Sequence, residues 1–563
     1  MKFKTSLIKI SLAAVVLIST SCNKQLNPLL TDPSQPTPAA ADNDLYLNNL
    51  QLNFKSFYQN ASDLGDQLVR YETMFGPTYF NAFTPSSFDG LWNTTYKSIF
   101  LTANTMIPLA ENKSQFLHAG IAQTLKAYTM ITMVDLFGDV PYSEAVQGVA
   151  NTNPKADPAA AVYDSAIAML DSAITNFGKT LSTGLPSNDL FYGGKKAAWT
   201  KLAKTLKLKA YVQERLVNTT VTAKISALLT ENDLINASAD DFVFSYGTKA
   251  VSPDSRHPHY SGNYGANTGT SDYLGTYFFW SLLKEKSIVD PRARYYLYRQ
   301  ITDLTVGNDS RLKDVTTAQF AIPCLYRTSP YPAGTCYCSV SPGYLGRDHG
   351  NNEGTPPDGA LKTTWGIYPV GGEFDANQNT PAGTDNNQVH GAGGNGINPI
   401  WMSSFTYFLK AEAALMLSTA GDPEALMETG ISRSFSTVAG FNTKIGYSIS
   451  SDTNLLITPT KTANYISYVR GKYNAAASTD EKLNIIEKEF YLSAWGNGLE
   501  PYNTYRRTGK PNNMQPVLNG NAGAFIRSFF YASVYVNFNK NATQKTGTET
   551  QVFWDNNPAN FIQ

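Results

Sequence analysis

Acidic residues are the first place to look for catalysis in this chain, because enzymes that cleave glycosidic bonds hold two carboxylates about 5 to 9 Å apart across a cleft. Two pairs are candidates, Asp348 with Glu353 and Asp89 with Asp139. Neither pair is singled out by its spacing. We therefore assign no catalytic residues, and a secreted glycoside hydrolase with a helical-barrel fold stays an alternative.

Glu412 is the one carboxylate with an unusual position. It continues a helical stripe formed by Trp401, Phe405, Phe408 and Leu415, with spacings of four, three, four and three residues. Such a stripe is predicted to face the core. A buried carboxylate must find a charged or hydrogen-bonding partner or take up a proton. We expect an arginine or backbone amides to pair with Glu412, which makes its role structural.

One segment of the sequence has the side chains of a possible calcium site. Asp375, Asn377 and Asn379 occupy alternating positions, as the first ligands of an EF-hand loop do. The sixth place, where that loop needs glycine, holds Thr380, and the twelfth holds Asn386 instead of glutamate. An EF-hand is therefore not expected. An irregular calcium site with oxygen ligands stays open, and no other metal or cofactor is predicted.

Three cysteines remain beyond the N-terminal region, at Cys324, Cys336 and Cys338. In an exported protein an odd number leaves a free thiol or an intermolecular bond. Pairing of Cys324 with Cys336 or with Cys338 would close a short loop and stabilise the fold by roughly 3 kcal/mol. The sequence does not choose between these pairings. A zinc site made of the three thiolates and His349 matches no common spacing.

The N-terminus has the features of an export signal. Three lysines lie among the first nine residues, and the apolar run 10–18 is shorter than the roughly 20 residues that a membrane-spanning helix needs. Small residues precede Cys22, as they do at a cleavage site. We predict that residues 1–21 are removed, that Cys22 is acylated, and that residues 22–44 form a proline-containing tether. A plain signal peptide is the alternative.

The composition excludes a polyanion as the partner and favours an uncharged ligand. Lys plus Arg equals Asp plus Glu at 45 each, and no basic tract is present, so the chain does not have the basic face that nucleic acids require. Aromatic residues make up 12% of the chain, and 33 of them are tyrosines. Tyrosine and tryptophan combine an apolar face with a polar edge, which suits sugars. Many of them are also expected simply to pack between helices.

Apolar residues recur with helical spacing along much of the chain. The clearest stripe consists of Leu117, Ile121, Leu125, Tyr128 and Ile131. This helix is predicted to end near Phe137, because Gly138 can take a left-handed cap conformation and Pro141 cannot continue the hydrogen-bond ladder. Further helices are predicted over about 158–177, 199–210, 401–415, 483–494 and 500–507.

These helices indicate one body over residues 45–563 that is mainly all-α. Helical pattern covers about 45–245 and 400–510, and residues 246–399 form a loop-rich insert in which glycine, asparagine, proline and tyrosine dominate. The segment 511–563 is expected to be irregular. Repeated helix pairs are typical of a helical-repeat scaffold, although no strict period is present. The scaffold would supply rigidity and the insert a recognition surface with few short strands.

Several segments, in this order behind the cysteine of the export signal, resemble the SusD/RagB family of nutrient-binding outer-membrane lipoproteins of Gram-negative bacteria. The likeness is closest to its SusD-like branch, starch-binding associating with the outer membrane. The segments are Asn27-Pro28, Asp135-Leu136-Phe137-Gly138-Asp139-Val140-Pro141-Tyr142, Trp199 to Leu208, Asp290-Pro291-Arg292, Lys410-Ala411-Glu412-Ala413 and Tyr505-Arg506-Arg507-Thr508-Gly509-Lys510-Pro511. Ala532 departs from the proline expected at its place.

The resemblance implies tetratricopeptide-like helix pairs and a protein anchored by lipid at the outer membrane and exposed at the cell surface. It also implies that the protein is not an enzyme: its expected role is to capture an oligosaccharide and, as a lid, deliver it to a SusC-like TonB-dependent transporter. The same role with a peptide ligand is an alternative, and a structural surface-layer or adhesion protein is another.

A lid of this kind needs aromatic planes and amides in a wet cleft. Tyr79 and Asn81 lie in a segment with glycine and proline and without an apolar period, and Trp365 lies in a similar one. The alternative for each aromatic residue is packing, most clearly for Trp280, which has helical spacing to Tyr277. The predicted ligand-binding residues are Tyr79, Asn81, Tyr277, Trp280, Tyr344, Trp365 and Tyr368.

Overall fold

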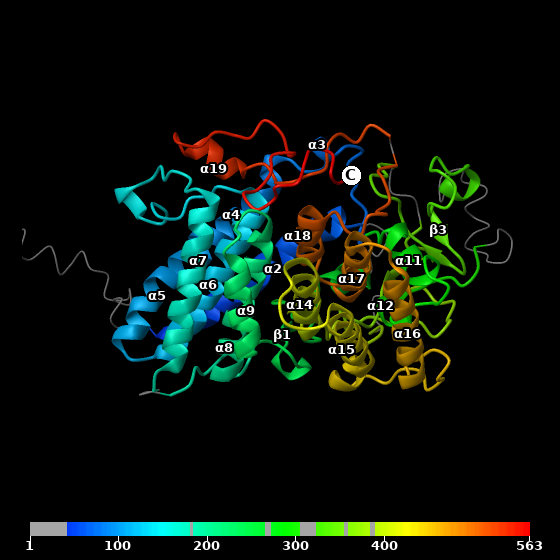
Figure 1. Ribbon diagram of the computed structural model, residues 1–563, viewed down its shortest axis with the longest axis horizontal. Helices are drawn as coiled ribbons and strands as arrows, with labels where there is room; N and C mark the ends of the chain where they lie inside the picture. Colours follow the sequence, from blue (N-terminus) through cyan, green and yellow to red (C-terminus); the bar gives the residue numbers. More distant parts are fainter. Residues whose placement is uncertain are drawn as a thin grey trace, which may run out of the picture.

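The computed structural model describes residues 42–180, 184–264, 272–304, 323–353, 358–382, 389–518 and 520–563. In this part of the chain helices dominate and the strands are few and short, so the predicted fold class is confirmed (Figure 1). The predicted signal peptide 1–21, Cys22 and nearly all of the predicted tether lie outside the described residues.

The N-terminal group of long helices packs in consecutive pairs, with α6 against both α5 and α7, and α8 against α7 and α9. Every residue of helix α6 from Leu117 to Phe137 is buried, which goes beyond the single apolar stripe that was predicted. The helix ends at Phe137, as predicted, but Gly138, at φ +74° and ψ −124°, lies outside the left-handed helical region expected for the cap. The helices are α2 (Asn43–Leu68), α5 (Leu101–Asn112), α6 (Phe116–Phe137), α7 (Ala159–Gly178), α8 (Lys196–Gln213) and α9 (Val221–Glu231).

The C-terminal group of long helices is built in the same way. Helix α14 packs against α15 and α17, and α15 packs against α16. Helix α2 contacts α5 and α6 on one side and α18 on the other, so it joins the two groups. The helices are α14 (Ser403–Leu417), α15 (Pro423–Lys444), α16 (Pro459–Ala475), α17 (Thr479–Ser493) and α18 (Leu499–Thr508).

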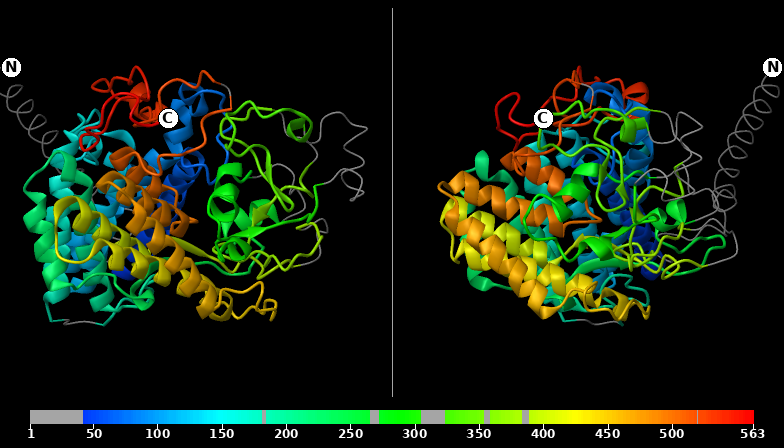
Figure 2. Two further views of the ribbon diagram at one scale, coloured as in Figure 1. Left: turned by 45° about the vertical axis from the view of Figure 1, so that its right-hand side comes forward. Right: turned by 90° about the vertical axis from the view of Figure 1, so that its right-hand side faces the viewer.

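The insert begins and ends on a two-stranded antiparallel ribbon. Strand β1 (Phe242–Ser245) pairs with β6 (Ile397–Trp401), so the chain leaves and re-enters the scaffold at one place. Figure 2 shows the insert beside the helical groups. It contains the short helices α10 (Pro258–Asn263), α11 (Thr276–Leu283) and α12 (Ala293–Tyr296), and the strand pairs β2 (Leu297–Tyr298) with β5 (Thr364–Trp365) and β3 (Ser339–Val340) with β4 (Tyr344–Leu345).

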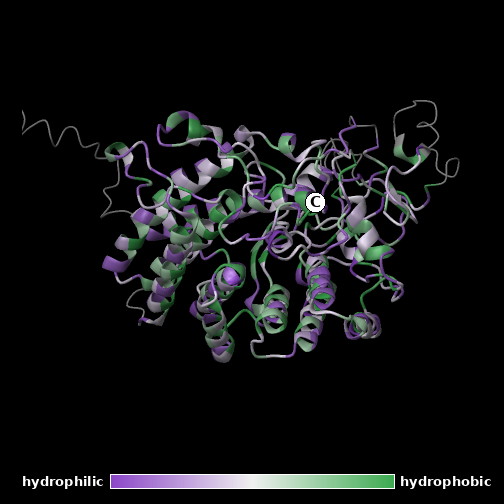
Figure 3. Cartoon of the chain, turned by 45° about the horizontal axis from the view of Figure 1, so that its top comes forward, coloured by the Kyte–Doolittle hydropathy of each residue, from purple (hydrophilic) through white to green (hydrophobic). Residues whose placement is uncertain are grey.

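Short elements and the irregular tail cover one end of the helical groups, at the top of Figure 1. Hydrophobic and hydrophilic residues both occur along individual helices in Figure 3, as expected when one side of each helix faces the core. The short elements are α3 (Tyr79–Ala82), the 3-10 turn η2 (Pro85–Phe88), α4 (Asp89–Asn93), the π-helical turn η3 (Thr94–Phe100) and α19 (Ser533–Phe538).

Candidate functional site

Five of the seven predicted ligand-binding residues are buried in the structure. Trp365 has no exposed surface, because its ring stacks on Trp495 with centroids 4.0 Å apart and on His259 at 4.4 Å. The local sequence around Trp365 lacks an apolar period, but strand pairing and these distant partners enclose it. The buried residues are Tyr79, Tyr277, Tyr344, Trp365 and Tyr368.

The hydroxyl groups of the buried tyrosines also have internal partners. The Tyr79 hydroxyl accepts from Arg70 at 3.2 Å and lies 3.1 Å from Nε2 of His349, and burial raises its pKa to about 12. Tyr344 donates to Asp375, and Tyr277 donates to Asn513 and accepts from Lys488. The five aromatic residues therefore pack inside the protein, which is the predicted alternative to ligand binding.

The other two predicted residues are more accessible. Asn81 is exposed and Trp280 is half-buried. The segment around Asn81 presents Phe75 and Phe80, which have 45% and 57% of their surface exposed. The edge-on contact of Phe80 with Phe530 places this segment beside the C-terminal tail. In this segment a ligand can therefore reach Phe75 and Phe80, and not Tyr79, which was the predicted ligand contact.

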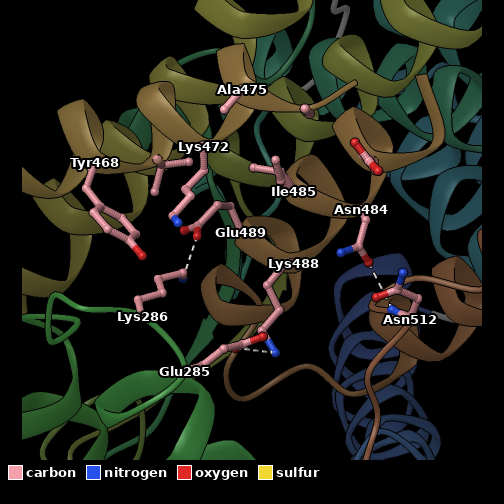
Figure 4. Close-up of a pocket in the computed structure, with 13 residues that line it drawn as sticks. Glu285, Lys286, Tyr468, Lys472, Ala475, Asn484, Ile485, Lys488, Glu489 and Asn512 are labelled. Carbon is pink, nitrogen blue, oxygen red and sulfur yellow. Dashed lines mark hydrogen bonds and ion pairs between the residues drawn. The ribbon is translucent and has the colours of Figure 1, made fainter. Parts of the chain in front are cut away.

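A pocket of about 450 Å³ lies between α16, α17 and the residues after α11 (Figure 4). Four of the charged groups that line it form two ion pairs: Lys286 lies 2.6 Å from Glu489, and Lys488 lies 2.7 Å from Glu285. Lys472 and Glu481 add one further charge of each sign. A neutral ligand would gain few contacts by separating such pairs. The charges of both signs suit a charged or zwitterionic ligand better.

A second pocket, of about 530 Å³, is lined by four aromatic rings, four side-chain amides and several aliphatic side chains. It lies between α4, η3, the loop 141–154 and α19, and we call it the aromatic pocket. Trp92 and Tyr535 are both buried and stack on each other with a centroid distance of 4.8 Å, so they form the base of the pocket. Phe538 stands at its edge with 80% of its surface exposed. Its other lining residues include Asn93, Tyr96, Lys97, Pro141, Gln147, Asn151, Pro154 and Asn539.

Asp89 holds the two sides of the aromatic pocket together. Its carboxylate accepts from the hydroxyl of Ser533 at 2.6 Å and from the amide of Val534 at 3.0 Å, which fixes the start of α19 against α4. Tyr96 donates to the carbonyl oxygen of Pro141 at 2.8 Å and fixes the loop side. The aromatic planes are therefore held before any ligand arrives.

The chemistry of the aromatic pocket suits an uncharged, hydroxylated ligand. The exposed ring of Phe538 and the half-buried ring of Tyr96 offer apolar surface, and the side-chain amides of Asn93, Gln147 and Asn151 offer both donors and acceptors. Lys97 is the only charged residue among the described residues that line it. Sequence reasoning missed this site, because Tyr96 and Phe538 are far apart in the chain and only tertiary packing leaves Phe538 exposed.

The carboxylates considered for catalysis have structural hydrogen bonds. Asp89 accepts from α19, and Asp139 accepts from the backbone amide of Ala159 at 2.7 Å, at the start of α7. Asp348 is buried and accepts from the amide of Cys338 and from Gln515. Glu353, its nominated partner, pairs with Arg327.

The predicted structural pairing of Glu412 is present. The side chain is fully buried and lies between Arg507 and Arg215. These two guanidinium groups outweigh the burial and lower the pKa of Glu412 to about 2. The residue therefore carries its charge in the folded protein.

The oxygen atoms considered for calcium face arginines. Asp375 is buried and accepts from Arg299 at 2.7 Å, and Asn377 accepts from Arg294 at 2.8 Å and from Arg299. Asn386 lies outside the described residues. Among the cysteines, the structure joins Cys324 to Cys338 and leaves Cys336 as a buried free thiol.

Two protein-family models match the sequence of this chain. A family model described as "Starch-binding associating with outer membrane" matches residues 33–315, about half of the 563-residue chain. A second, "Susd and RagB outer membrane lipoprotein", matches residues 378–551. The chain belongs to the SusD/RagB family. The predicted resemblance is thereby confirmed.

Solved structures of SusD homologues share the fold along nearly the whole chain. A SusD/RagB family protein from Bacteroides thetaiotaomicron has a TM-score of 0.66 at 18% identity, and the match covers 92% of this chain and 100% of that one. A homologue described as chitin-binding, from Flavobacterium johnsoniae, has 0.64 at 18%, with 91% and 99% covered. A Bacteroides uniformis homologue has 0.65 at 18%, with 92% and 99% covered. Comparison with curated protein sequences gives no match.

The family names connect this chain with the outer membrane. Among the described residues, the search for helices of the length and hydropathy required to cross a bilayer finds none. Acylation of Cys22 stays a prediction, because that residue lies outside the described part of the chain.

Proposed function

We propose that this SusD/RagB family member is a carbohydrate-binding lipoprotein that holds an uncharged oligosaccharide in the aromatic pocket and does not cleave it. The observation that carries the proposal is one pocket that brings together the exposed ring of Phe538, the half-buried ring of Tyr96, four side-chain amides and one cation, Lys97. The description of a homologue with the same fold as chitin-binding supports a glycan as the ligand class.

In this proposal Cys22 is acylated, the protein is anchored at the cell surface, and it acts as a lid that delivers the glycan to a SusC-like TonB-dependent transporter. The family names support the membrane association. A lid must release its ligand, and weak stacking and amide contacts in an open pocket meet that need without any chemistry.

A peptide ligand is the second candidate, and the pocket in Figure 4 is the feature that favours it. Peptide termini would need the ammonium and carboxylate groups there, four of which already pair as Lys286 with Glu489 and Lys488 with Glu285. In the aromatic pocket a ligand would not have to break ion pairs of this kind, so a glycan is the preferred ligand class.

The test is calorimetric titration of the purified protein with maltooligosaccharides, chitooligosaccharides and a mixture of short peptides, followed by an assay for released reducing ends. Binding of one sugar series without release supports the proposal. Release of reducing ends would establish a hydrolase, and binding of peptides alone would replace the glycan. Co-purification with a barrel transporter from outer membranes tests the delivery step separately.

A further inference from the structure

One imidazole ring is surrounded by acidic side chains where the insert meets helix α2. His259, in α10, has Asp63 and Asp66 near one ring nitrogen and Glu72 and Asp272 near the other. Within each group the possible ligand atoms all lie within 4.8 Å of one another. Asp63 and Asp66 are three residues apart on α2, so both point from the same side of that helix.

The Nδ1 edge of the ring already has a close partner. Nδ1 lies 2.5 Å from Asp272, whose carboxylate also accepts from Asn263 at 2.9 Å. When Nδ1–H donates to this carboxylate, Nε2 is the ring nitrogen that faces α2, where a metal ion can take the place of its proton. The ring plane is fixed by its stacking on Trp365, with centroids 4.4 Å apart.

The Nε2 edge has acidic neighbours but no short contact. Nε2 lies 3.4 Å from Asp63 Oδ1 and 3.5 Å from the Gln59 amide nitrogen, which donates to Asp63 at 2.7 Å. Both distances are longer than those of typical hydrogen bonds. Gln59 therefore orients Asp63 and leaves the edge open between Nε2 and the two aspartates.

Asp66 is the observation that points to a ligand at this edge. It is only 1% exposed, and among the described residues neither of its carboxylate oxygens has a hydrogen-bond partner. Glu72, 6% exposed, has one oxygen without a hydrogen bond in the same part of the chain, 3.6 Å from Nδ1 of His259. Buried carboxylates are normally paired or coordinate a metal, because an isolated charge away from water is very costly.

We propose that Asp63, Asp66 and the Nε2 atom of His259 bind a zinc ion. The 3.4 Å between Nε2 and Asp63 Oδ1 is close to the edge of a tetrahedron whose metal–ligand bonds are about 2.0 to 2.1 Å. Asp272 completes the arrangement in which a metal-bound histidine donates its other N–H to a carboxylate. The ion would also lie near the C-terminal end of α2, where a positive charge is favourable.

The donor set decides for zinc over calcium. An imidazole nitrogen with carboxylate oxygens is typical of zinc and similar transition metals, whereas calcium takes oxygen ligands alone. Asp63 keeps 35% of its side chain exposed, so the edge is reachable from solvent and the fourth position is available to water. The ion would fasten α2 to α10 and hold the insert on the scaffold.

The test measures zinc retained by the full-length protein after removal of any affinity tag, treatment with EDTA and addition of one equivalent of ZnCl2. We expect close to one zinc per chain and a rise of several degrees in melting temperature. Asp66→Asn and His259→Gln should each weaken binding at least tenfold and remove the thermal shift. Asp254→Asn, a partly exposed aspartate of the same insert, is the matched control and should behave as the parent protein does.

Two further measurements keep the proposal falsifiable. Metal-free Asp66→Asn should melt no lower than the metal-free parent, because it removes an unpaired buried carboxylate, and Cys336→Ser should retain zinc. Failure of the parent to retain zinc, or undiminished zinc in both ligand variants, would overturn the proposal. Stabilisation by CaCl2 but not ZnCl2 would overturn the choice of metal, and loss of zinc in Glu72→Gln with full retention in Asp66→Asn would overturn the choice of edge.

Discussion

Glu412 on α14 and Arg507 on α18 form a two-point ion pair in the core of the scaffold. Arg507 Nε donates to Oε1 at 2.8 Å, and its Nη2 donates to Oε2 at 2.6 Å. Arg215, from the turn after α8, donates to the same Oε1 at 2.8 Å. One carboxylate therefore connects three segments that are distant in the sequence.

Replacement of Glu412 by alanine should lower the free energy of unfolding by about 3 to 5 kcal/mol, because two buried guanidinium groups lose their partner. Urea denaturation at neutral pH measures the change. Glu428→Ala is a matched control, since Glu428 also meets a guanidinium, that of Arg470, but on the surface, and its loss should change little. Reduced glycan binding with unchanged stability would contradict a structural role for Glu412.

The same pair predicts an acid limit of stability. The folded-state pKa of Glu412, about 2, lies below the roughly 4.3 of an unfolded glutamate. Its contribution is therefore complete above that unfolded value and is lost as the pH falls toward 2. Urea denaturation of the parent protein between pH 7 and pH 2 should show that the free energy of unfolding falls over this window. The fall should be smaller in Glu412→Ala. Parallel curves for the two proteins would refute the assignment.

Glu487 should behave in the opposite way. It is buried beside Glu412, and burial together with the charge of Glu412 raises its pKa well above the ordinary value. The folded protein then binds one more proton than the unfolded chain above pH 4.3, so this residue lowers stability as the pH rises, by about 1.4 kcal/mol per pH unit until the folded pKa is reached.

Glu487→Gln removes this proton requirement and should raise the free energy of unfolding at pH 7 more than at pH 4. Urea denaturation at the two values measures the difference. Glu481→Gln on the exposed side of the same helix is the comparison, and an equal effect of Glu487→Gln at both pH values would show that the carboxyl does not take up a proton on folding.

Local pattern was enough to predict α6, because its stripe and its end signals at Gly138 and Pro141 all lie within a few turns of sequence. It was also enough to predict that Glu412 is buried. Neither arginine partner could be named, since Arg215 and Arg507 approach it only through tertiary packing. Periodicity shows which side of a helix is covered but not what covers it.

Local pattern failed for Trp365. The segment around Trp365 is rich in glycine and has no apolar period, which predicts an open loop. In the structure, β5 pairs with β2 and Trp495 covers the Trp365 ring. The converse failure is Phe538, whose exposure depends on the position of a tail fixed by Asp89. Exposure of an aromatic ring in an irregular segment is a tertiary property, so the sequence gives no local signal for it.

The disulfide between Cys324 and Cys338 should stabilise the insert. It closes a loop with a sequence separation of 14, which the entropic model values at about 3 kcal/mol. Cys324→Ser with Cys338→Ser should therefore lower the melting temperature, and Cys336→Ser should not remove the bridge. Mass spectrometry of peptides under non-reducing conditions identifies the pair, and a bridge that includes Cys336 would contradict the structure.

Cys336 should be unreactive in the folded protein. It is buried, and burial together with the charge of Asp348 raises the pKa of its thiol to about 12. The thiolate that reacts with alkylating reagents is then scarce at pH 8. Labelling with iodoacetamide should be slow until denaturant is added, whereas rapid labelling of the native protein would show that this part of the insert opens.

The aromatic pocket gives the most direct test of the proposed function. Phe538 is 80% exposed, so Phe538→Ala should leave the melting temperature unchanged, and the loss of one stacking plane, worth about 0.5 to 1.5 kcal/mol, should weaken glycan binding roughly twofold to tenfold. Leu45→Ala removes a similarly exposed apolar side chain from α2, away from the pocket, and is the matched control. Calorimetry with the preferred oligosaccharide measures both variants. Equal affinity of Phe538→Ala and the parent protein would place the ligand elsewhere, and the exposed Phe75 and Phe80 of the segment around Asn81 would be the next residues to replace.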